Sequence, residues 1–360
     1  MKIIHFCETL SIGGGISSFI KELSYEQCKS NEVSIGVINS DINTNRVSLH
    51  PSITVVDFDK RHTGFSIKYP IRIYQYLRRI NPDVVHIHSS FFYYFLSVLL
   101  LHKRIRFIYT VHSDAYKENA GWDKRLWKIK KWCFKLDWIR PVTISPTSKY
   151  SFDSLYELDS LMIVNGIKKP KFILKSEKFS DLRFTDDTLV LFHPARITEA
   201  KNQILLCEVV SQLILEGYDL VLVIAGVCQD NSIFQQLKGY FSERIVYWGE
   251  RSDVINLLSE ADAMCLSSIW EGLPISLLEA MSVGCIPICT PVGGIKDVIH
   301  NGLNGFIADD VDAKSYKEAI LHFINLSEKS KQIMKDNIRK SFNDYDISDV
   351  SAKYLRIYSF

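Results

Sequence analysis

The chain has 360 residues, of which 47% are hydrophobic and 23% charged, and its net charge is +2. These values are typical of a globular protein, which excludes an intrinsically disordered chain, and the near-neutral charge gives no indication of a nucleic-acid-binding protein. Because the chain is long for a single hydrophobic core, we expect two domains.

The first half of the chain alternates short apolar strands with helical patterns. Its first predicted strand, KIIHF (residues 2–6), leads into a glycine-rich loop and a helix over residues 17–27. Strands that are apolar throughout are buried on both faces, so the pattern indicates a parallel sheet covered by helices. Further strands are predicted at residues 33–38, 53–58, 83–88, 106–112, 140–145 and 161–167.

The second half repeats this plan, and its strands are predicted at residues 188–197, 219–226, 244–249, 263–268, 285–290 and 305–309. We therefore predict two doubly wound, Rossmann-like α/β domains at residues 1–167 and 188–340, joined by a polar linker at 168–187. Residues 341–360 are expected to form a helix that packs back on the first domain. Ligands bind at the carboxyl ends of such strands, so we expect a cleft where the two domains face each other.

The loop after the first strand contains Gly13, Gly14 and Gly15. A glycine loop that opens a helix lets backbone N–H groups approach an anion. A dinucleotide-binding loop would need G-x-G-x-x-G on a tight turn, but Ser18 replaces the third glycine and the loop is too long. The glycines therefore indicate either an anion-binding loop or a plain flexible turn.

Three histidines end neighbouring predicted strands. The H-x-H spacing puts His86 and His88 on one face of a strand, which suits a metal, yet no third ligand has diagnostic spacing. Packed or cleft-lining histidines are the better interpretation. His112, in TVHSD, stands at a strand end among small polar residues and is the best placed of the three to touch a substrate.

Residues 101–140 carry eleven Lys/Arg against four Asp/Glu, a local charge of +7, with tryptophans at 122, 127, 132 and 138. Tryptophan together with Lys/Arg is what an interfacial membrane contact needs. The alternative is a solvated helix face whose tryptophans pack on the domain. We predict a peripheral membrane contact through residues 117–138.

Two cations follow the strand that opens the second domain. Arg196 and Lys201, in PARITEAKNQ, lie beside a predicted helix start. A fixed arginine can bind a diphosphate bidentately and a lysine can bind it as a point charge. Taken alone, such a pair is more often solvated.

Two carboxylates flank a short predicted helix in WEGLPISLLEA (residues 270–280). Pro274 suits the first helical position, and the apolar run after it predicts a buried helix that ends near Gly284. Glu279 is embedded in this run, where a carboxylate needs a partner. Glu271 lies just before the helix, where N–H groups gather anions. The stretch predicts the wall of a ligand pocket.

The segment SSIWEGLPISLLEAMSVGCIPICTPVGGIKDVIHNGLNGFI resembles glycosyltransferase family four, the GT-B-fold group of mostly retaining enzymes that use nucleotide-diphosphate sugars. The resemblance extends to the glycine loop, TVHS, VNGI and the R-x-x-x-x-K pair. Two positions depart from the family pattern: Ala195 replaces a glycine before the arginine, and Lys168 replaces an acidic residue after NGI.

The resemblance implies a role for each candidate residue. Glu279 would accept hydrogen bonds from the ribose, and Glu271 would meet the hydroxyls of the donor sugar, with the N–H groups of Gly272 and Leu273 nearby. His112 would lie beside the anomeric centre and the sugar's hydroxymethyl group.

The same resemblance implies that Arg196 and Lys201 stabilise the leaving diphosphate. Gly14 and Gly15 would border the phosphate and the acceptor, and the nucleoside base would meet the chain around Gly249 and Arg251. The leaving phosphate oxygen would take the acceptor proton, so neither a protein base nor a metal cofactor is expected.

Two D-x-D pairs, Asp57–Asp59 and Asp310–Asp312, resemble a Mg-diphosphate motif of a different sugar-transferase architecture. The second pair begins a helix, where aspartate is an ordinary cap, and neither lies at the predicted site. A sugar-nucleotide epimerase would need acid/base groups that we do not find beyond His112. A non-catalytic partner subunit would have lost site residues that this chain keeps. We therefore expect an active hexosyltransferase acting on a glycan or lipid-linked acceptor, in surface polysaccharide biosynthesis.

The chain shows no sign of export or of a membrane span. Its longest apolar run, residues 91–101, is shorter than the roughly 20 residues of a spanning helix, and its N-terminus has no signal-peptide cleavage pattern. The eight cysteines include no C-x-x-C pair, which favours reduced thiols in a core. We expect a cytoplasmic protein, peripheral at the inner face of the membrane.

Overall fold

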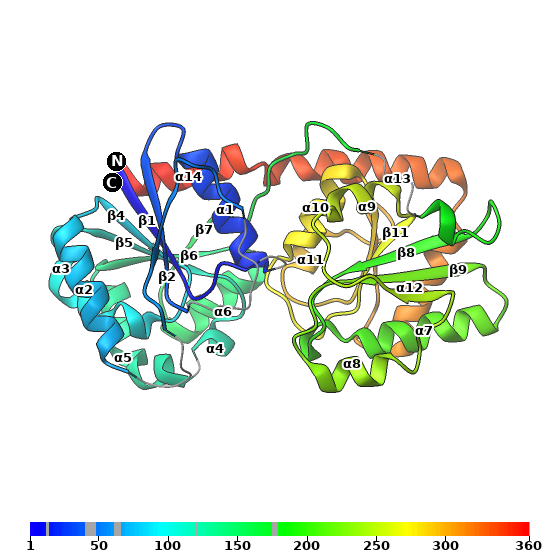
Figure 1. Ribbon diagram of the computed structural model, residues 1–360, viewed down its shortest axis with the longest axis horizontal. Coiled ribbons are helices and arrows are strands. Elements are labelled where there is room, and N and C mark those ends of the chain that lie inside the picture. Colours follow the sequence, from blue (N-terminus) through cyan, green and yellow to red (C-terminus); the bar gives the residue numbers. More distant parts are fainter. Residues whose placement is uncertain (12–13, 40–47, 61–65, 120, 175–178, 360) are drawn as a thin grey trace. The chain divides into compact units, whose positions relative to one another are not determined.

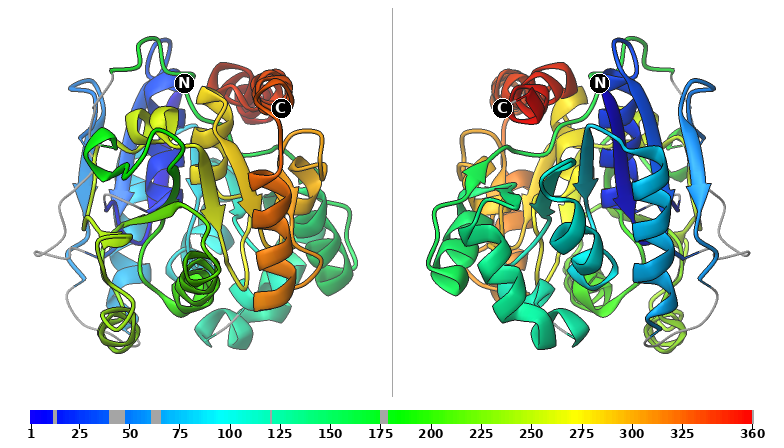
Figure 2. Two further views of the ribbon diagram at one scale, coloured as in Figure 1. Left: turned by 90° about the vertical axis from the view of Figure 1, so that its right-hand side faces the viewer. Right: turned by 90° about the vertical axis from the view of Figure 1, so that its left-hand side faces the viewer.

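The structure is a computed structural model that describes residues 1–11, 14–39, 48–60, 66–119, 121–174 and 179–359 (Figure 1). The chain divides into two compact units, one made of Met1–Lys168 with Ile347–Phe360 and the other of Lys169–Asp346. Each unit is a parallel sheet with helices on both faces (Figure 2), so the predicted doubly wound α/β architecture is confirmed.

The sheet of the first unit has the strand order β3-β2-β1-β4-β5-β6-β7. Its strands are β1 (Lys2–Cys7), β2 (Glu32–Val37), β3 (Thr54–Asp57), β4 (Val84–Ile87), β5 (Arg106–Val111), β6 (Ile139–Thr143) and β7 (Leu161–Met162). Its helices are α1 (Gly15–Gln27), α2 (Lys68–Ile80), α3 (Phe95–Leu101), α4 (Ala115–Glu118), α5 (Gly121–Lys135), α6 (Pro146–Tyr156) and α14 (Ile347–Ser359).

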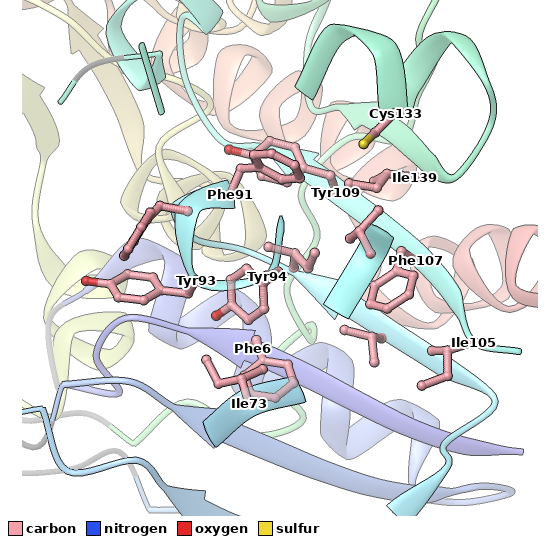
Figure 3. Packing of buried hydrophobic residues seen from close by; sticks show 14 of the residues in the cluster. Phe6, Ile73, Phe91, Tyr93, Tyr94, Ile105, Phe107, Tyr109, Cys133 and Ile139 are labelled. Atoms are coloured by element: carbon pink, nitrogen blue, oxygen red, sulfur yellow. The ribbon is translucent and has the colours of Figure 1, made fainter. Parts of the chain in front are cut away.

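The two faces of this sheet differ in character because successive side chains of a strand point to opposite faces. On one face, apolar side chains such as Phe6 and Tyr109 pack with Ile73 of α2 and Cys133 of α5 (Figure 3). Fully burying side chains of this size stabilises a fold by about 1.5–3 kcal/mol each. The opposite face carries histidines and lies under α1 and α14, which contact each other.

The sheet of the second unit has the strand order β10-β9-β8-β11-β12-β13. Its strands are β8 (Leu189–Pro194), β9 (Leu220–Ala225), β10 (Ile245–Tyr247), β11 (Ala263–Leu266), β12 (Ile286–Cys289) and β13 (Phe306–Ile307). Its helices are α7 (Gln203–Leu215), α8 (Asn231–Leu237), α9 (Val254–Glu260), α10 (Ile275–Val283), α11 (Ile295–Val298), α12 (Ala313–Ile324) and α13 (Glu328–Ser341).

Part of the segment predicted as a linker, 168–187, is anchored in the second unit. The Phe179 side chain is 2% exposed and stacks on Trp248, with ring centroids 5.2 Å apart. Arg183 forms an ion pair with Asp262 at 2.8 Å. The second unit runs from Lys169 to Asp346. The returning helix α14 starts at Ile347, later than the predicted residue 341.

Several other expectations can be compared directly. Asp312, from the second D-x-D pair, caps α12 by accepting a hydrogen bond from Ser315 N at 2.8 Å. All eight cysteines are free thiols, and most are buried. Among the residues that the structure describes, no helix is both long and apolar enough to cross a membrane.

Candidate active site

Charged side chains meet at the carboxyl edge of the second sheet, between β8 and β11. The order of strands reverses here, because β9 lies on one side of β8 and β11 on the other. Doubly wound sheets bind ligands at such points. Lys201 follows β8, Glu271 follows β11, and Lys201 Nζ lies 2.5 Å from Glu271 Oε1. Their side chains are 17% and 10% exposed, so the pair is largely but not fully desolvated.

The loops that carry this ion pair are joined through their backbones. Ile269 N donates to Ala200 O at 2.8 Å, and Ser268 Oγ donates to the same Glu271 oxygen at 2.6 Å. The ammonium of Lys201 and the carboxylate of Glu271 are thus held by the loops as well as by their own attraction. Such support is what keeps a charged site in one geometry before a ligand arrives.

Glycines of the PVGG stretch let a second loop approach Glu271. Gly293 has φ +53°, and a Cβ atom at this position would lie 2.1 Å from Glu271 O. Gly294 N donates to Gly272 O at 2.7 Å. Only glycine combines this backbone conformation with so close an approach. The sequence PVGG therefore fixes the backbone of the residues that begin the candidate pocket wall.

The helix after Glu271 is α10, and it differs from the prediction by one residue at its start. Pro274 is its N-cap, with φ −65°, rather than its first helical residue, and Gly284 ends it with φ +79°. Leu273 is buried, whereas Glu279 is half-buried on the helix. Glu271 is in direct contact with Lys201, but Glu279 stands on α10 itself, so the two carboxylates occupy different places.

Arg196 comes two residues after the end of β8 and is half-buried. Its Nη1 donates to Gln229 Oε1 at 3.1 Å, and its carbonyl accepts from Nε2 of the buried Gln203 at 2.8 Å. Arg196 and Lys201 therefore lie five residues apart in the loop that follows β8. The side chain of Gln203, on α7, is hydrogen-bonded to the backbone of this loop.

Gly249 lies next to the residue that follows β9, whereas the side chain of Arg251 is paired within its own loop. Gly249 O accepts from Gly226 N at 2.7 Å, and a Cβ atom on Gly226 would lie 2.1 Å from Ala195 O. Arg251 forms an ion pair with Asp253 at 2.5 Å, so its charge is balanced locally. Its backbone, rather than its charge, is the part suited to reading a neutral nucleoside base.

The remaining candidates, His112, Gly14 and Gly15, belong to the first unit; Gly13 lies outside the described residues. Gly14 is the N-cap of α1, and its carbonyl accepts from Ser18 N at 2.9 Å. The α1 side chain of Phe19 packs edge-on against the His112 ring, with centroids 5.9 Å apart. Burial lowers the pKa of His112 to about 3, so its imidazole is neutral at physiological pH.

A possible metal cluster lies beneath His112. His5, His86 and His88 offer ring nitrogens that lie within 4.8 Å of one another. Each ring nitrogen of these three histidines already has a hydrogen-bond partner: Gln27, His88, Tyr358, Thr110, His5 or His112. A cation bound there would have to break these buried bonds, so the donor set fits a hydrogen-bonded network better than a metal.

The basic segment is only partly a surface. Lys130 is 2% exposed and is paired with the equally buried Asp123 at 3.2 Å, while its Nζ also donates to Tyr109 Oη at 2.9 Å. Lys130 therefore cannot face a membrane, contrary to the sequence-based interpretation of the whole stretch. Trp127 packs against the core, whereas Trp132 is 48% exposed.

Three residues of these sites escaped the sequence analysis. Ser268 holds Glu271, and its only signal is its place just after a strand. His5 and Gln27 join the histidine network, at 2.8 Å from one another. His5 pairs in register with His86, so the parallel alignment of β1 and β4 was the signal that could have found it.

Comparison with known proteins covers both units. The family described as Glycosyltransferase Family 4 matches residues 13–167, and the family described as Glycosyl transferases group 1 matches residues 175–341. A UDP-Gal:alpha-D-GlcNAc-diphosphoundecaprenol alpha-1,3-galactosyltransferase of Escherichia coli is 25% identical, over 78% of this chain and 76% of its own length. A GDP-mannose:cellobiosyl-diphosphopolyprenol alpha-mannosyltransferase of Komagataeibacter xylinus is also 25% identical, over 99% and 93%.

Among solved structures, Anabaena HepE in complex with UDP and glucose superposes with a TM-score of 0.80 at 15% identity, covering 100% of this chain and 99% of that one. Likeness at this identity shows the shared GT-B fold. The two family matches, the fold and the relatives agree with one another along nearly the whole length. This chain belongs to glycosyltransferase family 4 and is a glycosyltransferase of the GT-B fold.

Proposed function

We propose that the protein transfers a hexose from a nucleoside-diphosphate sugar to a hydroxyl of a lipid-linked glycan, with retention of anomeric configuration, in surface polysaccharide synthesis. The observation that carries the proposal is the contact between Lys201 and Glu271 at the strand-order reversal of the second sheet. This contact places a cation that suits the diphosphate next to a carboxylate that suits the sugar hydroxyls.

The charges suit the bond changes of the reaction. As the bond from the anomeric carbon to the phosphate oxygen breaks, negative charge grows on the diphosphate, where Lys201 and Arg196 would stabilise it. Glu271 would lie at the sugar, where positive charge develops. The acceptor oxygen forms the new bond, and its proton passes to the leaving phosphate oxygen, so no protein base or metal cofactor is needed.

The other candidates would bind the parts of the donor that do not react. Glu279, on α10, would accept hydrogen bonds from the ribose, and the N–H groups of Gly272 and Leu273 would face the donor. The backbone near Gly249 and Arg251 would contact the base. From the first unit, His112 would touch the sugar, and Gly14 and Gly15 would border the phosphate and the acceptor.

The acceptor class is supported by what the relatives share. The names of the Escherichia coli and Komagataeibacter xylinus enzymes specify different donors, UDP-Gal and GDP-mannose, but both specify a sugar diphosphate on a polyprenol lipid. We therefore extend the lipid-linked acceptor to this chain and leave the base and the sugar of the donor to experiment.

A lipid-linked acceptor requires access to a membrane, and α5 offers a suitable face. Lys124, Lys128 and Lys135 are exposed, and at 100° per residue they lie on one side of the helix, with the exposed Trp132 and Leu136 next to them. We propose that this face, with the buried Lys130 left out, docks peripherally on the anionic cytoplasmic surface of the membrane.

Transfer itself is tested with purified protein. Thermal shifts with UDP-galactose, UDP-glucose, UDP-N-acetylglucosamine and GDP-mannose identify the donor that raises the melting temperature. NMR of the product formed with a short-chain polyprenyl diphosphate sugar then gives the anomeric configuration. We expect an α-linked product. A β-linked product would contradict retention, and no stabilisation together with no transfer would contradict the proposed function.

Membrane docking is tested by co-sedimentation with vesicles of phosphatidylglycerol and phosphatidylcholine. Binding should weaken as salt rises, since charges are screened over about 10 Å at 0.1 M ionic strength. Replacing Lys124, Lys128 and Lys135 with Glu should abolish it. The matched control, Glu at the exposed Lys314, Lys329 and Lys340 of the second unit, makes the same charge change and should still bind. Equal loss in both triple variants would show that only net charge matters.

A further inference from the structure

A continuous chain of hydrogen bonds runs beneath the first sheet from α1 to His112. Gln27 Oε1 lies 2.8 Å from His5 Nε2, and His5 Nδ1 lies 3.1 Å from His88 Nε2. His88 Nδ1 then lies 2.9 Å from His112 Nε2. Gln27 and His5 are fully buried and His88 is 4% exposed, so water does not interrupt the chain.

All three rings of this chain are neutral. Burial lowers the pKa of His5 to about 4 and that of His112 to about 3, and it holds the pKa of His88 well below its usual value. A neutral imidazole has one nitrogen that donates and one that accepts. The direction of one hydrogen bond therefore fixes the direction of every other bond in the chain.

Gln27 sets that direction. Its amide oxygen can only accept, so the hydrogen of His5 is on Nε2 and His5 Nδ1 accepts from His88. Burial raises the pKa of Tyr358, whereas its interaction with the Gln27 side chain lowers that pKa. A group that lowers the pKa of a phenol does so by donating a hydrogen bond to it. The amide nitrogen thus faces the Tyr358 phenol, although no described acceptor lies within hydrogen-bond distance of it. This orientation leaves the oxygen toward His5.

The chain ends on an atom with no partner. With its hydrogen on Nε2, His112 has a lone pair on Nδ1, and this nitrogen is buried without a hydrogen-bond partner in the described part of the protein. A buried acceptor without a donor is costly, and a ligand that supplies a hydroxyl removes that cost. We propose that Gln27, His5 and His88 hold His112 in the Nε2-protonated tautomer, so that Nδ1 accepts a hydrogen bond from a hydroxyl of the donor sugar.

This inference rests on the proposed function for the identity of the hydroxyl, but not for the tautomer. Gln27, His5 and His88 are positioning residues, because they act through His112. The second hydrogen-bonded branch, in which His86 contacts Tyr358 at 2.5 Å and Thr110 at 2.7 Å, meets the chain only through the action of the Gln27 amide on the Tyr358 phenol. The tautomer of His112 therefore depends on Gln27, whose amide is oriented by Tyr358 of α14.

Tautomers are read directly by NMR of protein labelled with ¹⁵N-histidine, in which two-bond couplings separate protonated from unprotonated ring nitrogens. The His112 signals are those that disappear in His112→Gln. We expect a protonated Nε2 and an unprotonated Nδ1 in the unliganded wild-type protein. A protonated Nδ1 would overturn the proposal, and this spectrum decides the question even if a variant fails to fold.

Gln27→Met tests whether the chain sets the tautomer, since Met keeps the length of the side chain but replaces the amide oxygen with a sulfur that accepts only weakly. We expect mixed His112 tautomers and a kcat/KM lowered at least tenfold. Ser24→Ala, at a buried serine one turn earlier on α1, is the matched control and should change neither. An unchanged His112 spectrum in Gln27→Met would overturn the proposal. The spectra are recorded without a sugar donor. A failure of the proposed transferase function can therefore be distinguished from a failure of the proposed tautomer.

Discussion

The candidate residues of the two units differ in their charge. In the first unit, burial keeps such groups neutral: it lowers the pKa of His5 to about 4 and raises the pKa of Glu118 to about 7. In the second unit, Lys201 and Glu271 form an ion pair that keeps some contact with solvent. Neutral rings suit the recognition of hydroxyls, whereas a leaving diphosphate needs permanent charge.

A buried ion pair of the first unit supports the same rule. Lys130 and Asp123 are each 2% exposed, and they are paired with one another. Asp123 also accepts from the backbone of Phe91 at 2.9 Å and from Phe92 at 3.1 Å. A charge stays buried only where partners of this kind satisfy it. Whether a buried side chain is charged or neutral therefore depends on the hydrogen-bond and ion-pair partners around it. Substitutions that remove such partners test this conclusion.

Lys201→Met should have the largest effect. The substitution leaves Glu271 without its ion-pair partner. If Lys201 stabilises the leaving diphosphate as we propose, kcat should fall about 10²–10³-fold. Lys201→Arg keeps the charge and should recover part of the rate. Steady-state kinetics on variants of unchanged melting temperature make the measurement. A change confined to KM would mean that the cation binds the donor equally in ground and transition states.

Gly293→Ala should break the second unit's site through its backbone. The new Cβ would lie 2.1 Å from Glu271 O at a residue with φ +53°, so the Glu271 loop must shift. We expect a large loss of kcat and a stability loss of at least about 1–3 kcal/mol, measured by urea unfolding. Gly302→Ala has φ +76° but meets nothing within 4 Å, so this control isolates backbone strain from the clash. Equal effects of both substitutions would show that backbone strain, and not the clash with Glu271 O, causes the loss of activity and stability.

The sequence predicts the strands of both units because each is an apolar run bounded by polar residues. It does not predict that Lys201 touches Glu271, since their strands become neighbours through a non-consecutive crossover between β8 and β11. The histidine chain likewise depends on the register of β1 with β4, which pairs His5 with His86, 81 residues later in the sequence. Lys130 was misread because only the fold shows that it shares the buried side of α5 with Asp123, seven residues earlier.

Glu279→Gln separates the two carboxylates of the second unit. If Glu279 grips the ribose in ground and transition states alike, its loss should raise the donor KM about tenfold, corresponding to roughly 1.4 kcal/mol. Glu271→Gln should instead lower kcat, because positive charge develops at the sugar. Both are measured by steady-state kinetics on folded proteins. The same rise in KM for both, with kcat unchanged, would defeat this division of labour.

Glu118→Gln probes the first unit, where burial raises the carboxyl pKa to about 7 from 4.5. The folded state therefore binds this proton more tightly than the unfolded state, and the cost of ionising Glu118 is fully present above pH 7 and absent below about pH 4.5. The variant should be more stable than the wild type at pH 8, and the difference should vanish by pH 4.5. Its amide oxygen can still accept from Ser113 N, which donates at 2.7 Å. Urea unfolding across this range tests the sign.

Chelation should have the smallest effect. In the second unit, Lys201 and Arg196 follow the same strand, and we propose that they supply the fixed positive charge that a metal would otherwise provide. In the first unit, the ring nitrogens of His5, His86 and His88 are occupied by hydrogen bonds. Dialysis against EDTA should therefore leave both kcat and the melting temperature unchanged. Loss of rate restored by Mg²⁺ or Mn²⁺ would mean that charge at the diphosphate is not supplied by the protein alone. A lower melting temperature that Zn²⁺ restores would instead indicate that the three histidines bind a metal. The hydrogen-bonded network of neutral histidines in the first unit would then be wrong.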